Sequence, residues 1–169
     1  MAKRIDIASG DYLKGLNDVI ENLQEEVDRL KTQSVEGLRA ALIYVADESQ
    51  KRAPVEFGDL RGSVLVEIDG TVIAKGKPSG LSDEEKKERR KEGNVQAESG
   101  QGLIIVSEKA PEDGTVGTIS YNTPYAANQH EHTEYDHPLG GQAKYLESVL
   151  TGDKDKIPEI IAGNMEVMS

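Results

Sequence analysis

The sequence contains no cysteine and no tryptophan, and Phe57 is its one phenylalanine. Without thiols the chain can form neither a disulfide framework nor a thiolate metal site. With so few large aromatic side chains, the core must be built from aliphatic residues and some of the six tyrosines. No stretch approaches the ~20 apolar residues of a membrane span, and no apolar run of a signal peptide follows the first residues. We therefore expect a soluble protein that is made in a cytoplasm.

Acidic residues outnumber basic ones, 31 to 20, which gives a net charge of −11. Such a surface repels phosphate and disfavours direct DNA binding. An acidic wall could still line a passage through which DNA slides without sticking. The length of 169 residues is enough for one domain with a real core. We expect residues 1–169 to form that single domain.

Residues 11–51 have the apolar spacing of one amphipathic helix. Its stripe comprises Leu16, Ile20, Leu23, Val27, Leu30, Leu38, Ala41 and Val45, interrupted only by the polar Ser34. A straight helix of this length would measure about 60 Å at ~1.5 Å per residue, which exceeds the roughly 40 Å diameter of a compact domain of this size. We therefore expect the helix either to break near residues 32–34 or to project from the body. The period fits 3.6 better than 3.5 over the whole stripe, which favours core packing over a coiled coil.

From Ser63 onward the apolar period changes to two, which is typical of strands. Asp69-Gly70 is a strong signal for a two-residue hairpin turn, and residues 71–74 are expected to form the returning strand. Further strands are predicted at 102–107 and 115–121. The pattern predicts an α+β fold: an antiparallel sheet of about four strands packed against a long, possibly broken, N-terminal helix, with short C-terminal helices.

Residues 75–101 form a long insertion between two predicted strands. Ser82 and Glu85 have the spacing of a helix capping box, and the segment between Leu81 and Val95 contains no apolar residue to bury. We expect a mobile, charged insertion with a nascent helix. Its cations form a basic island on an acidic protein and could serve as an assembly arm that orders against a neighbour: Lys86, Lys87, Arg89, Arg90 and Lys91.

A short turn separates the predicted helix from the first strand. Its main residues are Pro54, Gly58, Leu60, Arg61 and Ser63. Pro54 cannot continue a helix, and Gly58 permits a positive φ. We expect Leu60 to be buried and Arg61 to make a charge-assisted hydrogen bond that fixes the turn. Local chemistry alone indicates a helix-to-strand connection.

A second group of residues follows the last predicted strand and comprises Pro124, Tyr125, Ala126, Glu131, Tyr145 and Leu146. Taken in order with the turn, this pattern resembles the tail-completion, or head–tail joining, proteins of the necks of long-tailed bacteriophages, which are related to phage minor capsid proteins. The resemblance covers about residues 13–150. The chain departs from the family pattern at Phe57, at the segment 130–133 and in the length of the insertion.

The resemblance implies a structural virion protein rather than an enzyme. Copies would form a homo-oligomeric ring, a hexamer, that joins the head connector to the tail or terminates the tail tube. DNA would pass through the channel without specific binding, and the partners would be other neck, connector and tail proteins, with no cofactor and no membrane. A minor capsid or decoration protein is an alternative of the same class.

An alternative of a different class is a small metal-dependent hydrolase. His130, His132 and His137 lie close together in the sequence among several carboxylates, and such residues can bind Zn²⁺. In an extended segment His130 and His132 would share one face. The His-Glu-x-x-His spacing of helical metalloproteases is absent, and so are nucleophile-elbow and phosphate-loop motifs. We expect no tightly bound metal and no catalytic residue.

Overall fold

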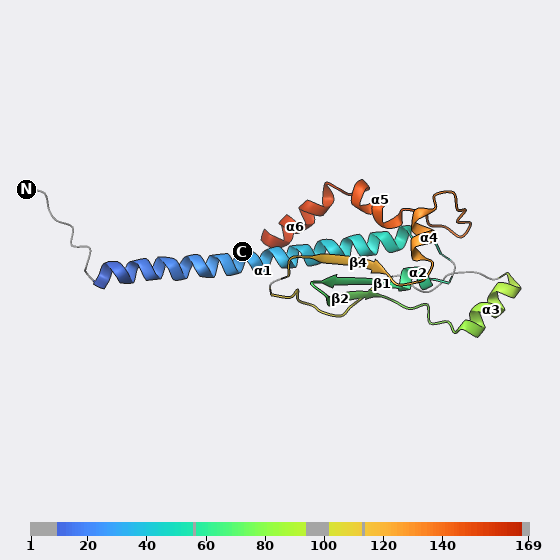
Figure 1. The fold of residues 1–169 in the computed structure, drawn as a ribbon, viewed down its shortest axis with the longest axis horizontal. Helices are drawn as coiled ribbons and strands as arrows, with labels where there is room; N and C mark the ends of the chain where they lie inside the picture. The colour runs from blue at the N-terminus through green and yellow to red at the C-terminus, as the bar shows by residue number, and fades with distance from the viewer. Residues whose placement is uncertain (1–9, 56, 94–101, 113, 167–169) are drawn as a thin grey trace, which may run out of the picture.

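The structure is a computed structural model that describes residues 10–55, 57–93, 102–112 and 114–166. A long helix, α1 (Gly10–Arg52), forms the middle layer of the body. A four-stranded antiparallel sheet packs on one side of α1, and α5 (Tyr145–Gly152) and α6 (Lys156–Glu166) pack on the other side (Figure 1). This arrangement confirms the α+β fold. None of the helices in the described ranges is long and apolar enough to cross a membrane.

The sheet has the strand order β3-β2-β1-β4. Its strands are β1 (Val64–Ile68), β2 (Thr71–Gly76), β3 (Leu103–Ile105) and β4 (Gly117–Tyr121). The predicted hairpin joins β1 and β2, where Asp69 has a φ of 45° and Gly70 a φ of 78°. Two successive positive φ values are what a type I′ turn needs, and they explain the Asp-Gly sequence at this position.

The core lies between α1 and the inner face of the sheet. The predicted alternation in β1 is confirmed, because Val64, Val66 and Ile68 are buried while the residues between them are half-buried. Val35 and Ala46 of α1 and two residues of β2 complete this cluster. This cluster is aliphatic, and Tyr145 is buried in a second cluster, so the core uses aliphatic residues and a tyrosine as the composition predicted.

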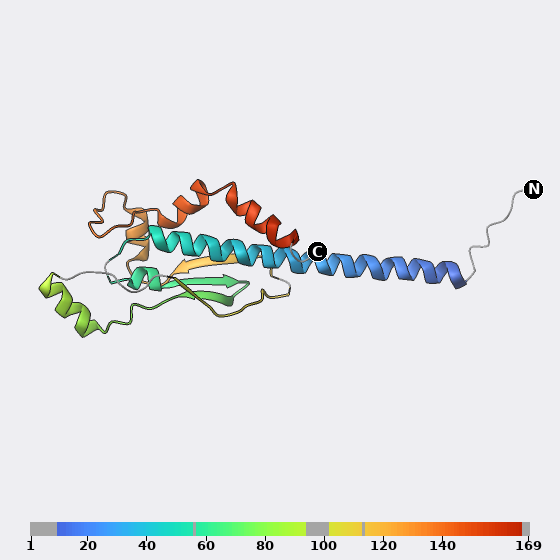
Figure 2. The same cartoon turned by 180° about the vertical axis from the view of Figure 1, so that it is seen from behind.

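Helix α1 does not break. The predicted break near residues 32–34 is wrong, and the alternative, a helix that projects from the body, is confirmed (Figures 1 and 2). Ser34 is an exposed residue inside the helix. The body contacts the second half of α1, where Ala41 and Val45 of the predicted stripe are buried.

Gly37 marks the point where α6 crosses α1. A Cβ atom at Gly37 would lie 2.8 Å from the backbone oxygen of Ile161 and 3.0 Å from its side chain. Glycine weakens a helix by about 1 kcal/mol relative to alanine. Here the missing side chain permits the close approach of α1 and α6. The packing of these two helices therefore explains why a residue of low helix propensity stands inside α1.

Three short helices complete the fold: α2 (Asp59–Gly62), α3 (Asp83–Glu92) and α4 (Ala126–Glu131). The predicted capping box of α3 is present, since the Ser82 hydroxyl accepts from the Glu85 amide and the Glu85 carboxylate accepts from the Ser82 amide. Helix α3 lies at the end of the molecule opposite the projecting part of α1 (Figure 1).

Candidate functional site

The turn after α1 is organised by the Arg61 guanidinium. Its Nε and Nη2 donate to the backbone oxygen of Ala53 at 3.0 and 2.8 Å, and Nη2 also donates to the oxygen of Lys51 at 3.1 Å. These carbonyls lie at the end of α1, where helical oxygens have no partner within the helix. Gln50 Nε2 in turn donates a hydrogen bond of 2.6 Å to the backbone oxygen of Arg61. The charge-assisted bond expected of Arg61 is therefore present.

Burial of Arg61, which is 6% exposed, lowers its pKa. The guanidinium stays charged, because an arginine is not deprotonated in proteins at ordinary pH. This cation among carbonyl oxygens ties the turn to the end of α1.

Leu60 is 4% exposed, as expected, and packs in a cluster with Ala53, Ala126 and Tyr145. The cluster thus joins the turn to the second sequence group, which follows β4. Ser63 supports the turn by donating from Oγ to the Leu60 oxygen at 2.8 Å. Gly58 has a φ of 80°, which explains the glycine at the start of α2.

Tyr145 is the buried centre of the second group. Its ring makes edge-on contacts with Tyr121 and His130, with ring centroids 4.9 and 4.8 Å apart. Its hydroxyl donates to the Ala126 oxygen at 3.3 Å, and burial raises the pKa of Tyr145 to about 12. Ala126 is buried and Leu146 is half-buried at this contact.

Other members of the second group lie at the surface. Pro124 and Tyr125 are exposed. The Glu131 carboxylate accepts from Lys144 Nζ and contacts His130 Nδ1 at 2.7 Å. The hydrogen bond from Lys144, followed by that from His130, lowers the pKa of Glu131. The structure therefore places Tyr145, Ala126 and Leu146 in the packing, whereas Pro124, Tyr125 and Glu131 lie at the surface.

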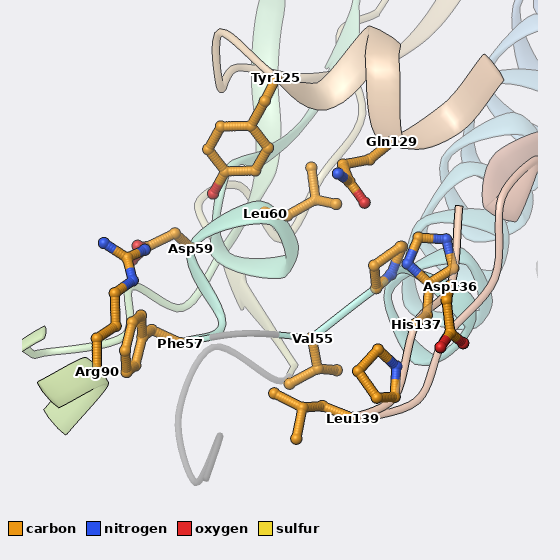
Figure 3. A pocket seen from close by; sticks show the side chains of 12 residues that line it. Val55, Phe57, Asp59, Leu60, Arg90, Tyr125, Gln129, Asp136, His137 and Leu139 are labelled. Carbon is orange, nitrogen blue, oxygen red and sulfur yellow. The ribbon is translucent and has the colours of Figure 1, made fainter. Parts of the chain in front are cut away.

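A pocket of about 500 Å³ opens beside the turn (Figure 3). Four segments meet there: the turn, α3, α4 and the loop before α5. The lining residues are Pro54, Val55, Phe57, Asp59, Leu60, Arg90, Tyr125, Gln129, Asp136, His137, Pro138 and Leu139. We call this the turn pocket. Its wall is mainly apolar, with an arginine, two carboxylates and a histidine, and it suits an apolar side chain or a short peptide segment.

The loop before α5 is the part of the turn pocket that sequence reasoning missed. Its backbone is tied to the end of α1 by bonds from Val55 N to Gly140 O at 3.3 Å and from Gln142 N to Arg52 O at 2.8 Å. A Cβ atom at Gly141 would lie 2.5 Å from Pro54 Cα and from the Ala53 oxygen. The Gly140-Gly141 pair was the available signal, because two adjacent glycines can mark a close backbone approach.

Helix α3 is anchored to the turn by two of the five cations of the basic island. Lys86 Nζ lies 2.9 Å from Asp59 Oδ1, which also accepts from Ser79 Oγ at 2.9 Å. The Arg90 guanidinium lies over the Phe57 ring, 5.0 Å from its centroid. Lys87 and Lys91 are exposed and Arg89 is half-buried. Helix α3 therefore lies next to the turn pocket.

The histidines occupy separate environments. His130 lies in the last turn of α4 and His132 follows it as the C-cap, so the two do not lie in an extended segment that would place them on one face. His132 contacts Glu134 at 2.6 Å and stacks on Tyr135, while His137 lines the turn pocket. Within the described ranges, no three His, Cys, Asp or Glu side chains are grouped so that they could hold a metal ion.

No family model, no curated protein and no solved structure matches this chain.

Proposed function

We propose that the protein is a structural subunit of a phage neck, a tail-completion or head–tail joining protein. Copies assemble into a ring at the head–tail interface or at the top of the tail tube. The support is the ordered series of short motifs, whose buried members meet in one cluster: Leu60 from the turn with Ala126 and Tyr145 from the second group.

The observation that carries this proposal is that the subunit has two unlike ends. At one end, α1 projects with apolar side chains exposed, including Ile20 and Leu23 at 56% and 61%. At the other end lie the turn pocket and α3, which carries the exposed cations Lys87 and Lys91 (Figure 1). Unlike surfaces at opposite ends suit head-to-tail contacts, which generate rings when the rotation closes.

The sheet offers a further contact between copies. Strands β3 and β4 are the two edges of the sheet. At the β3 edge, Ile104, Ile105 and Val106 are 37%, 43% and 52% exposed. An exposed apolar edge strand is a template for pairing with another chain. Pairing of the β3 edge of one copy with the β4 edge of the next would continue the sheet around the ring.

The net charge of −11 suits a ring through which a genome passes. Acidic side chains that line the channel repel phosphate, so the DNA slides without binding. In this role the protein needs no catalytic residue and no cofactor. Its place is in the virion, and its partners are further copies and the neighbouring connector and tail proteins.

The test uses a phage genome that encodes this chain, with its gene disrupted. We expect infected cells to accumulate filled heads and separate tails, and plasmid-borne protein to restore joined particles. Electron microscopy of virions that carry a tagged subunit should place the tag at the neck. A tag spread over the head surface would indicate a minor capsid or decoration protein instead, and complete virions without the gene would refute both roles.

A further inference from the structure

The projecting part of α1 exposes a continuous apolar surface. We call residues 17–31 the rod and its apolar side chains the rod stripe: Val19, Ile20, Leu23, Val27 and Leu30, which are 44% to 61% exposed. Further along the same helix Val35, Ala41 and Val45 are buried in the body. A helix that stands alone in water gains nothing from such a stripe, because most helix stability in proteins comes from packing an apolar face.

The spacing of the rod stripe is that of a helix–helix seam. Ile20, Leu23, Val27 and Leu30 are separated by three, four and three residues, a repeat of 3.5. This repeat differs from the 3.6 period of the whole stripe and defines a narrow seam, whereas a helix that packs on a sheet or a core shows a wider apolar face. The occupant that fits this seam is therefore another helix with the same narrow repeat.

The body of the chain restricts the direction of that second helix. At the base of the rod, Val27, Leu30 and Val35 form one wall of a groove of about 440 Å³, and Glu112, Gly114 and Thr115 form the other. A parallel partner helix over the rod stripe would continue into the segment around Gly114 and the sheet behind it. An antiparallel partner instead ends near the groove, and its body lies beyond the free end of the rod.

We propose that the rod stripe pairs with the rod stripe of a second copy in an antiparallel, two-stranded coiled coil. The pairing that uses each helix from residue 10 to about 33 places Ile20 of one copy beside Leu23 of the other. A β-branched residue then meets a leucine across each central layer. The proposal concerns the free protein and does not depend on the neck function. In the proposed ring, the pair must separate before the same stripe contacts the next copy.

The contact has the size of a reversible interface. Two helices side by side over ~36 Å, each ~10–12 Å wide, bury on the order of 900 Å² in total, which is the range of weak complexes. We expect a dissociation constant in the micromolar range, roughly 1–100 μM.

The charge of the rod gives the pairing a distinctive salt dependence. Residues 17–31 carry five carboxylates against two cations, Arg29 and Lys31. Two such rods repel each other, and salt screens that repulsion. Dimerisation should therefore become stronger between 50 mM and 500 mM NaCl. An interface held by opposite charges would respond in the opposite direction.

The first experiment measures the mass of the purified full chain by sedimentation equilibrium. We expect twice the monomer mass of 18.4 kDa at high protein concentration. Leu23→Glu should raise the dissociation constant by roughly a hundredfold or more, because each copy would bury a carboxylate in the seam. Asn22→Glu adds the same charge at the neighbouring position, which is outside the rod stripe. This control should change the dissociation constant by less than about fivefold. A monomer at all concentrations, or an unchanged dimer in Leu23→Glu, overturns the proposal.

The second experiment tests the direction of pairing and uses the absence of native cysteine. A mixture of the Ile20→Cys and Leu23→Cys proteins should form a mixed disulfide dimer on mild oxidation, while each protein alone should form little. Efficient disulfide formation in each protein alone would show a parallel pair and would overturn the antiparallel arrangement. Thermal unfolding of each variant checks that the body is intact, as expected for side chains of the projecting rod.

Discussion

The Arg61 guanidinium binds the Ala53 carbonyl oxygen through two nitrogens, Nε at 3.0 Å and Nη2 at 2.8 Å. A residue near the end of the turn thus binds the end of the helix that precedes the turn. The same carbonyl lies at the closest approach of Gly141, so the end of α1, the turn and the loop before α5 share one contact point. This point lies next to Pro54 in the chain, and Pro54 lines the turn pocket.

Arg61→Lys should destabilise the protein although the charge is kept. A lysine cannot reproduce the two-nitrogen contact, and buried carbonyl oxygens would lose partners. We expect the free energy of unfolding to fall by about 1–3 kcal/mol in urea. The matched control is Arg52→Lys, because Arg52 pairs with Asp153 at the partly exposed surface and such pairs contribute about 0–1 kcal/mol. Equal losses in the two variants would show that Arg61 acts as a simple surface cation.

Gly37→Ala should also destabilise the protein, although alanine has a higher helix propensity than glycine. Alanine would gain about 1 kcal/mol within α1. Its Cβ, however, would lie 2.8 Å from the backbone oxygen of Ile161, so α6 would have to shift. We expect a net loss of about 1–3 kcal/mol in urea unfolding.

The control for this prediction is Gly163→Ala in α6, where nothing lies within 4 Å of the added Cβ. That variant should be stabilised by up to about 1 kcal/mol. If both alanine variants were stabilised, α6 would not be held close to α1 in solution.

Stability should decrease at alkaline pH through Tyr145. Burial raises the pKa of Tyr145 to about 12, above the ordinary value of 10.0 that applies to the unfolded chain. The folded state therefore holds the phenolic proton more tightly. Its contribution is complete below pH 10 and is lost as the pH rises towards 12, by about 2–3 kcal/mol in total.

Denaturant unfolding from pH 8 to pH 12 measures this loss. Tyr145→Phe should show a shallower decline over the same range. Burial also raises the pKa of Tyr121, so part of the decline should remain in the variant. A decline of the same steepness in both proteins would assign the effect to other groups.

Removal of α3 should separate assembly from stability. Replacing residues 82–92 by a Gly-Ser bridge removes the Lys86–Asp59 pair and the Arg90–Phe57 contact but no buried apolar side chain of α3. We expect a cost of up to about 2 kcal/mol and a folded subunit. Joined heads and tails should fall in a complementation assay, and high salt should weaken assembly of the intact ring.

A matched pair of substitutions refines this test. Lys87→Glu with Lys91→Glu changes exposed cations and should reproduce the assembly defect with an unchanged melting temperature. Joining at parental levels after deletion of α3 would show that the insertion is tolerated and has no part in assembly.

Sequence patterns predicted those features that depend on neighbours in the chain. The period of two in β1, the Asp69-Gly70 turn and the capping box at Ser82 each follow from local geometry, and the structure contains all three. The burial of Leu60 and the bond from Arg61 were also predictable, because one apolar and one cationic residue stand between two glycines.

Features that depend on distant segments were not predictable. The break near Ser34 was inferred from the size of a compact domain, but the helix continues outside the body, so that size limit does not apply. The turn pocket needs residues 136–139 to fold back onto Pro54 and Val55, and no spacing in the sequence shows this. His130 of α4 likewise contacts the distant Tyr145, which no local pattern shows.

The continuity of α1 gives the molecule the mechanics of a cantilever. Its 43 residues form one helix of about 64 Å at ~1.5 Å per residue. The second half of this helix is held between the sheet and α5–α6. A sideways force on the free end acts as a bending moment on the grip. The bending moment pushes α1 and α6 together or apart at Gly37 and Ile161. The two backbones are in direct contact there, because Gly37 has no side chain. A sideways force on the rod is therefore transmitted to α6 through this contact.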